Sequence, residues 1–299
     1  MKQKIIIDCD PGFDDAITIA MALSNPKLDV LGITTVTGNR DLEKTTANAL
    51  RTLEYFGYQN IPVYKGSQKP LIREPYRSGK ENPHGLDGLG DTNLPTPLIK
   101  ARENAVGFID EQVKKYSGEI IILAIGPLTN IATLLNLNNK PLIKSLYIMN
   151  GAFGTPGNTG LYAEFNAFFD PEAAKIVYDS GLPINVVGLD ITDSVAITRE
   201  NFFKISKIGT KASNFLLNTH RWAVEKKVKK EYAIFWDECA LIWLIDDTII
   251  KSKNGRIGVD TDDEFRGRTV FTEKDCNIKV GTDINIEKSF KYLFNFLKA

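Results

Sequence analysis

The sequence has few cysteines, no excess of either charge and only two histidines. Its three cysteines, Cys9, Cys239 and Cys276, are odd in number and form no CxxC pair, which argues against a disulfide framework and a thiolate zinc site. Lys plus Arg and Asp plus Glu both total 37, so no basic field favours nucleic acid or an anionic membrane. We therefore expect a small, neutral partner molecule.

Long hydrophobic runs are also missing. No stretch is long enough to span a bilayer, and the N-terminus lacks the basic flank and apolar core of a secretory signal. With 299 residues and 43% hydrophobic content, the chain can bury a full core, and we expect one domain over residues 1–299. These features predict a cytoplasmic enzyme.

Short apolar runs alternate with helical patterns over the first two thirds of the chain. The runs rich in β-branched residues predict strands at 4–8, 28–36, 62–66, 119–125, 145–150 and 183–189. The helical patterns between them predict helices at 14–24, 42–57, 103–117, 128–137 and 171–180. This alternation predicts an α/β fold with a mostly parallel central sheet flanked by helices.

The pattern changes after about Leu189. We expect helices there, including a Lys-rich amphipathic one over 220–232, then short, possibly antiparallel strands at 256–260, 269–273 and 277–283 and a final helix. The sequence from Gly66 to Pro97 has no regular pattern and many Pro and Gly residues. Because long loops in compact domains are usually functional or disordered, we expect this one to border the site.

Four aspartates crowd the end of the first predicted strand. "IIIDCDPGFDDA" places Asp8, Asp10, Asp14 and Asp15 within one turn, where parallel sheets bind their ligands. A helix dipole accounts for one or two acidic residues but cannot offset several close repulsions. The spacing is not that of an EF-hand, and oxygen ligands favour calcium or magnesium over zinc.

Further polar groups follow the other predicted strands. Asn39 in "TGN" follows the second, "IGPLTN" follows the strand ending at Ile125, and "NGAFGTPGNTGLYAEFN" follows the one ending at Met149. Asp170 before Pro171 is typical of a helix N-cap. Asp237 is also placed to cap the helix "DECALIWLI".

An ordered set of tags resembles the nucleoside hydrolase family of the inosine–uridine type. The tags are "DCDPGFDDA", "TGN", "HGLDGLG", "GPLTNIA", "GN" followed by "AEFN", "DPEAA" and "WDECA", from residue 8 to about 240. The resemblance implies a Rossmann-like nucleoside hydrolase fold and a homodimer or homotetramer. It also implies cleavage of ribonucleosides to ribose and free base through an oxocarbenium-like transition state, with bound Ca²⁺.

The resemblance implies the roles of matched positions. The calcium ligands would be Asp10, Asp15, the Ile125 carbonyl and Asp237. Asp10 would also be the general base that takes a proton from the attacking water. Asp8 would hold these residues in place without itself contacting the ion or the substrate.

The ribose would be held by a second set of matched positions. Asp14 and Asn39 would contact its 2′ side, and Asn166 would contact the diol. Asn158 and Glu164 would hold the 5′-hydroxyl. Asn39 and Asn158 are also typical turn formers, so their side chains have a structural interpretation as well.

The leaving base is where the sequence departs from the family. Inosine–uridine members have His before the late metal Asp, whereas this chain has Trp236. Either Trp236 stacks on a purine, or Tyr232, His84 or His220 donates a proton. His84 matches a His near the base, whereas His220 lies in the Lys-rich segment and is expected to be exposed. Purine or broad specificity is favoured, although a core Trp is the structural interpretation.

Two other function classes remain open. Asp8-Cys9-Asp10 imitates the start of aspartate-nucleophile phosphatases, although Gly12 and the second acid pair count against that class. A calcium-dependent nucleoside or sugar binder without turnover is conceivable because the expected His is missing.

Overall fold

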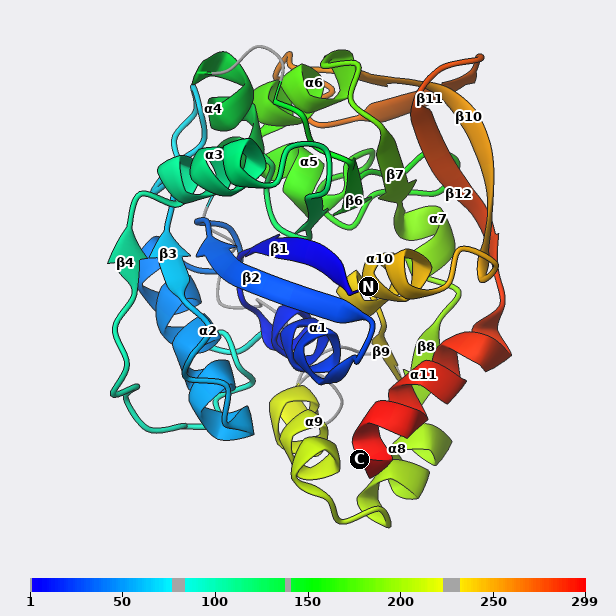
Figure 1. The fold of residues 1–299 in the computed structure, drawn as a ribbon. Coiled ribbons are helices and arrows are strands. Elements are labelled where there is room, and N and C mark those ends of the chain that lie inside the picture. The colour runs from blue at the N-terminus through cyan, green and yellow to red at the C-terminus, as the bar shows by residue number, and fades with distance from the viewer. Residues whose placement is uncertain (1, 77–83, 138–140, 223–231) are drawn as a thin grey trace.

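The computed structural model describes residues 2–76, 84–137, 141–222 and 232–299. Its main feature is a ten-stranded sheet (Figure 1). The strand order is β11 (Thr269–Glu273), β10 (Ile250–Val259), β12 (Ile278–Ile284), β7 (Ile184–Val187), β6 (Ser145–Met149), β5 (Ile121–Ala124), β1 (Gln3–Cys9), β2 (Leu28–Thr35), β3 (Val63–Lys65) and β4 (Arg102–Glu103). From β12 to β4 neighbouring strands are parallel. The predicted α/β fold is therefore confirmed.

Eleven helices occur in the described part of the chain. They are α1 (Phe13–Ser24), α2 (Leu42–Phe56), α3 (Ala105–Lys115), α4 (Thr129–Leu137), α5 (Phe165–Phe169), α6 (Pro171–Asp179), α7 (Leu189–Thr192), α8 (Arg199–Ser206), α9 (Lys211–Trp222), α10 (Asp237–Ile245) and α11 (Ile286–Lys298). The five predicted N-terminal helices correspond to α1, α2, α3, α4 and α6. Asp170 caps α6 as predicted, since its side chain accepts from the Ala173 N–H and Pro171 opens the helix.

The C-terminal strands extend the main sheet. Strand β10 pairs antiparallel with β11 and β12, and β12 then runs parallel to β7. A separate pair, β8 (Ala196–Thr198) and β9 (Tyr232–Ile234), is antiparallel. The Lys-rich helix predicted over 220–232 falls mostly on 223–231, which lie outside the described residues. None of the described helices has the length and apolar character needed to cross a bilayer.

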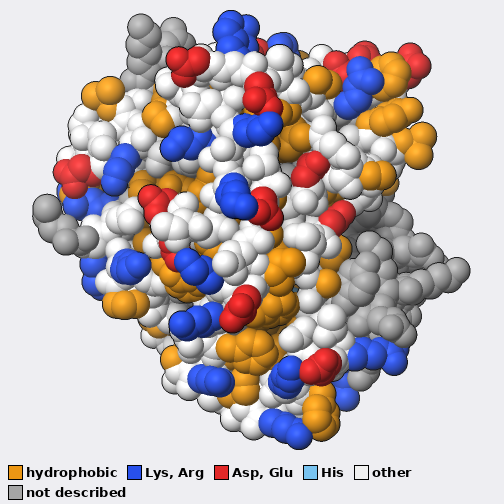
Figure 2. Space-filling model, turned by 90° about the vertical axis from the view of Figure 1, so that its right-hand side faces the viewer, with side chains coloured by type: hydrophobic (Ala, Val, Ile, Leu, Met, Phe, Trp, Pro, Cys, Tyr) orange, Lys and Arg blue, Asp and Glu red, His pale blue; other side chains and the backbone are white. Residues whose placement is uncertain are grey.

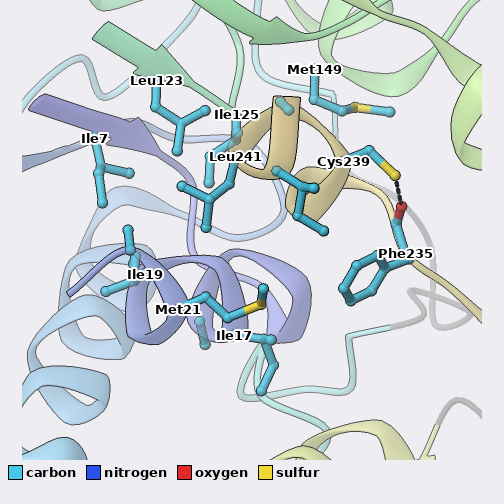
Figure 3. Packing of buried hydrophobic residues seen from close by; sticks show 14 of the residues in the cluster. Ile7, Ile17, Ile19, Met21, Leu123, Ile125, Met149, Phe235, Cys239 and Leu241 are labelled. Atoms are coloured by element: carbon cyan, nitrogen blue, oxygen red, sulfur yellow. Dashed lines mark hydrogen bonds between the residues drawn. The ribbon is translucent and has the colours of Figure 1, made fainter. Parts of the chain in front are cut away.

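Hydrophobic side chains pack on both faces of the sheet. Successive residues of β1 point to opposite faces, so Ile5 and Ile7 join one cluster with α1, α2, α10 and α11, while Ile6 joins another with α3, α4 and α6. Figure 3 shows α1 and α10 against the strands, with Leu241 between the two helices and Ile17 on the side of α1 that faces away from the strands. On the surface, charges of both signs are interspersed over the face in Figure 2.

The strand order changes direction beside β1, an interior strand of the sheet. The chain runs from β1 through β2 to β3 in one direction, then returns to place β5 on the other side of β1. Loops leaving the carboxyl ends of β1 and β5 therefore diverge, and open α/β sheets bind their ligands at such a switch point. The aspartates after β1 lie at this point.

Candidate active site

The turn after β1 is held together by carboxylates that accept backbone hydrogen bonds. Asp15 accepts from the N–H groups of Gly12 at 2.8 Å and Asp10 at 3.2 Å. Asn39, after β2, donates from its backbone N–H to Asp10 Oδ2 at 2.6 Å. Its side-chain amide donates to the Asp10 carbonyl at 3.2 Å and to Asp15 at 3.4 Å. Asn39 thus lies in the site.

Asp14, Asp15 and Asp237 form the acidic centre of the site. One carboxylate oxygen of each lies within 4.8 Å of the others, and all three residues are buried. The first turn of α1 carries Asp14 and Asp15, as predicted, and α10 begins with Asp237. Burial raises the pKa of all three, and the neighbouring carboxylates raise the pKa of Asp15 and Asp237 further.

Asp10 lies beside this centre, next to Asp15. Burial and the Asp15 charge raise its pKa. A Cβ at Gly38 would lie 2.0 Å from Asp10 Oδ2, so the turn after β2 needs glycine for this close approach. Among the described residues, the buried Asp10 Oδ1 and Asp14 Oδ1 have no hydrogen-bond partner. Unpaired, oxygen-only donors among mutually repelling carboxylates fit a hard cation such as calcium or magnesium.

Glu238 is a further buried acid that the sequence interpretation missed. Neither of its carboxylate oxygens has a hydrogen-bond partner in the described part of the chain, and burial and Asp14 raise its pKa. The signal that could have found it is the acid pair Asp237-Glu238 at the start of α10, which repeats the Asp14-Asp15 pair of α1.

Asn166 and Glu164 lie at the start of α5. The Asn166 amide donates to the carbonyls of Ile125 at 3.1 Å and Met149 at 3.2 Å, which joins the ends of β5 and β6. Glu164 caps α5 and accepts from the N–H groups of Asn166, Ala167 and Gly151. Burial raises the Glu164 pKa to about 7.

The structure does not bring every predicted residue into the centre. Asn158 is exposed, and Thr159 donates to its side chain at 3.4 Å. Tyr232 begins β9, and its side chain is outside the described part of the molecule. Asp237 is not the cap of α10, because the helix begins with it and the N-cap is Trp236, without a side-chain capping bond.

Phe13 is the centre of an aromatic cluster beside Asp14. Its ring centroid lies 4.4 Å from each of His84 and His220 and 6.3 Å from Trp236. His84 Nδ1 accepts from the Phe13 N–H at 3.3 Å and lies 3.6 Å from Asp14 Oδ1. The loop from Gly66 to Pro97 therefore borders the site at His84, as predicted.

The prediction that His220 is exposed is wrong. The residue is fully buried on α9, because this helix packs its apolar side against α1 and Phe13. Its Nδ1 lies 3.1 Å from the Leu216 carbonyl, and Nε2 has no hydrogen-bond partner. Burial lowers the pKa of both His84 and His220 to about 3, so both rings are neutral near pH 7.

Asp8 lies beneath the turn, inside β1. Its Oδ1 accepts from Thr34 and, at 2.8 Å, from Asn130, whereas its buried Oδ2 has no partner. Burial raises its pKa to about 6. Asp8 thus lies two residues before Asp10, at the carboxyl end of β1.

The chain resembles known proteins over nearly its whole length. A sequence model of the family described as inosine-uridine preferring nucleoside hydrolase matches residues 5–291. The pyrimidine-specific ribonucleoside hydrolase RihB of Escherichia coli O1:K1 / APEC is 36% identical over 300 residues, covering 96% of this chain and 94% of that protein.

Solved structures show the same fold. The plant nucleoside hydrolase PpNRh1 superposes with a TM-score of 0.93 and 31% identity, and covers 100% of each chain. A purine-preferring ribonucleoside hydrolase from Gardnerella vaginalis gives a TM-score of 0.92 and 28% identity, covering 99% of this chain and 98% of its own.

Proposed function

This chain belongs to the inosine-uridine preferring nucleoside hydrolase family, and from that premise we propose that it is a calcium-dependent ribohydrolase of purine or broad specificity. Membership makes it a glycosidase that acts on nucleosides. The observation that carries the proposal is the buried meeting of Asp14, Asp15 and Asp237 beside Asp10, at the sheet's switch point.

Nucleoside hydrolases are metal-dependent, and the donor set here fits calcium. We assign the ion to Asp10, Asp15, the Ile125 carbonyl and Asp237, and the unpaired Asp10 Oδ1 supports that assignment. Several carboxylates and a carbonyl suit calcium, whereas magnesium keeps most of its waters. When bound, the ion supplies positive charge that offsets the carboxylate repulsion and polarises the reacting water.

Asp10 takes the role of general base. Its Oδ2 is oriented by the Asn39 N–H, and Asp10 accepts the proton of the water that attacks C1′ of the ribose. The C1′–N bond breaks as the water approaches C1′, and its electron pair leaves with the nucleobase. Negative charge from the buried carboxylates stabilises the oxocarbenium-like transition state.

Ribose recognition falls to the remaining polar residues. Asp14 and Asn39 contact the 2′ side, Asn166 the diol, and Asn158 and Glu164 the 5′-hydroxyl. For Asp14, the unpaired Oδ1 supports this role. A buried polar group left without its hydroxyl costs about 1–3 kcal/mol, so deoxyribonucleosides are poor substrates.

The nucleobase lies against Trp236 and His84, with Tyr232 nearby. Trp236 stacks on a purine, and its buried Nε1–H, which has no partner among the described residues, can donate to an acceptor of the base. Because His84 Nδ1 accepts from the Phe13 N–H, the proton of the neutral ring is on Nε2. A neutral imidazole does not give up this proton, so solvent supplies the proton that the leaving base takes up.

The cellular setting is also part of the proposal. Residues 1–299 act as one domain, since one sheet runs from β11 to β4. The protein works as a cytoplasmic homodimer or homotetramer in nucleoside catabolism, including purine salvage, and binds neither nucleic acid nor membranes.

A substrate panel tests this function. The purified protein with calcium is incubated with inosine, adenosine, guanosine, uridine and cytidine, and reducing sugar is measured. Ribose release from at least the purine nucleosides is expected. Binding without release would identify a nucleoside-binding protein, and release only from pyrimidines would overturn the proposed specificity.

A further inference from the structure

Asn130, on the first turn of α4, uses all of its hydrogen-bonding capacity inside the protein. Its amide nitrogen donates to Asp8 Oδ1 at 2.8 Å and to the Thr35 carbonyl at 3.1 Å. Its oxygen accepts from the backbone N–H of Ser67 at 2.9 Å and from the Ser67 hydroxyl at 3.0 Å. One fully buried side chain therefore joins β1, β2, α4 and the segment after β3.

The contact with Asp8 is the important one. Asp8 lies two residues before Asp10 and is held by Thr34 and Asn130 at the same oxygen, Oδ1. The described residues give its other oxygen no partner. Buried polar groups are costly unless paired, so these two donors fix the position of the Asp8 side chain and of the strand end that carries Asp10.

The segment after β3 is fitted to Asn130. A Cβ added at Gly66 would lie 2.3 Å from Asn130 Oδ1, so only glycine allows this approach. On its other side, the segment from Ser67 to Leu71 lines an open cavity of about 510 Å³ with Thr129. The segment is thus held from within by Asn130 and by Asp170, which accepts from the Leu71 N–H at 2.9 Å.

We infer that Asn130 is a positioning residue for catalysis, which holds Asp8 and thereby sets the place of Asp10 relative to the ribose. This inference rests on the proposed function, in which Asp10 is the general base. The hydrogen bonds of Asn130 with the described residues reach none of those assigned to the ribose, so we expect it to affect the rate of bond cleavage more than substrate affinity. A misplacement of about 1 Å costs up to roughly 100-fold in rate.

Three variants distinguish an effect of Asn130 on the position of Asp10 from an effect on the stability of the fold. N130D keeps the shape and the acceptor for Ser67 but replaces the donor facing Asp8 with a second acceptor. N130A removes all of these bonds, and S67A is the matched control because it removes one bond to Asn130 and leaves Asp8 untouched. The measurements are kcat and KM for ribose release, calcium affinity and thermal unfolding.

We expect N130D and N130A to lower kcat by about 10–100-fold at saturating calcium, with KM within about threefold, and to weaken calcium binding as well, because the displaced Asp10 is also assigned to the ion. S67A should keep kcat within about twofold. A folded N130D with wild-type kcat, or a loss of kcat equal in S67A, would overturn the inference. So would an N130D that fails to fold, because Asn130 would then serve the fold itself. Absence of ribose release by the wild-type protein would instead refute the proposed function.

Discussion

The backbone N–H of Asn39 donates a 2.6 Å hydrogen bond to Oδ2 of Asp10, so the turn after β2 orients the carboxylate that follows β1. This leaves Oδ1 of Asp10 buried and without a hydrogen-bond partner in the part of the chain that the structure describes. The fold thus fixes Oδ2 of Asp10, and Oδ1 can bind the ion or accept a proton from water. The two strands contribute a positioned base, which neither could hold alone.

Asp10→Asn should abolish the general base while keeping the shape of the turn. We expect kcat for ribose release to fall by about 10³-fold, within the range that general-base catalysis contributes. Asp179→Asn, which removes an exposed carboxylate paired with Lys175, is the control and should leave kcat unchanged. Near-normal turnover in the Asp10 variant would remove Asp10 from its assigned role.

Asp237→Asn should weaken calcium binding, because it removes one of the carboxylates assigned to the ion. We expect affinity to fall by roughly 100-fold or more, measured by isothermal titration. The control is Asp170→Asn, since Asp170 is a helix cap outside the acidic centre and Asn also caps helices. Unchanged affinity in the Asp237 variant would show that the ion lies elsewhere.

Trp236→Ala should change substrate preference. If Trp236 stacks on purines, kcat/KM for inosine and guanosine should fall by about 2–10-fold more than kcat/KM for uridine. Trp236→Phe keeps an aromatic face and should preserve most of the preference. An equal loss for all nucleosides would indicate that Trp236 serves the core.

The stability of the metal-free protein should depend on pH. Burial raises the pKa of Asp8 and Asp14 to about 6 and that of Glu164 to about 7, against values near 4 when unfolded. Their contribution to stability is therefore full below about pH 4 and is lost as pH rises through 6 to 7. His84 and His220 act oppositely, because their pKa falls to about 3 and their contribution is lost as pH drops below about 6.5.

The carboxylates outnumber the histidines, so with a chelator present Tm should be higher at pH 5 than at pH 7.5. Burial and neighbouring carboxylates also raise the pKa of Asp10, Asp15 and Asp237, the carboxylates assigned to the ion. Calcium competes with the protons of these three acids and should raise Tm clearly at pH 7.5 but little at pH 5. At about 100 times Kd, the ion stabilises the folded state by about 2.7 kcal/mol. A calcium effect on Tm that is equal at both pH values would contradict the assignment of the ion to these buried acids.

Short stretches of sequence correctly predicted individual strands and helix starts. Strands β1, β2 and β6 consist mostly of β-branched and apolar residues, which is a local signal for a strand. Asp170-Pro171 is a local signal for the start of a helix, and it needs no information on tertiary structure. The sheet order could not be predicted in this way. The insertion of β12 between β10 and β7 depends on pairing between strands far apart in the chain.

The site was predicted less completely, for reasons of tertiary packing. His220 was expected at the surface because Lys-rich sequence follows it, yet α9 turns it onto Phe13. Asp237 was expected as a cap, but the helix begins one residue earlier than that role requires. Two features were missed because they arise only when distant parts of the chain pack together. They are the burial of Glu238 and the four hydrogen bonds of the Asn130 side chain.

The central claim is that the buried acids after β1 and at the start of α10 hold the calcium ion on which ribonucleoside cleavage depends. It is tested most directly by titrating calcium into the chelator-stripped enzyme with inosine, while bound calcium and ribose release are followed together. We expect about one ion per chain, with ribose release rising in proportion to the bound ion. Full ribose release by the stripped protein, or calcium binding without any gain in rate, would contradict the claim.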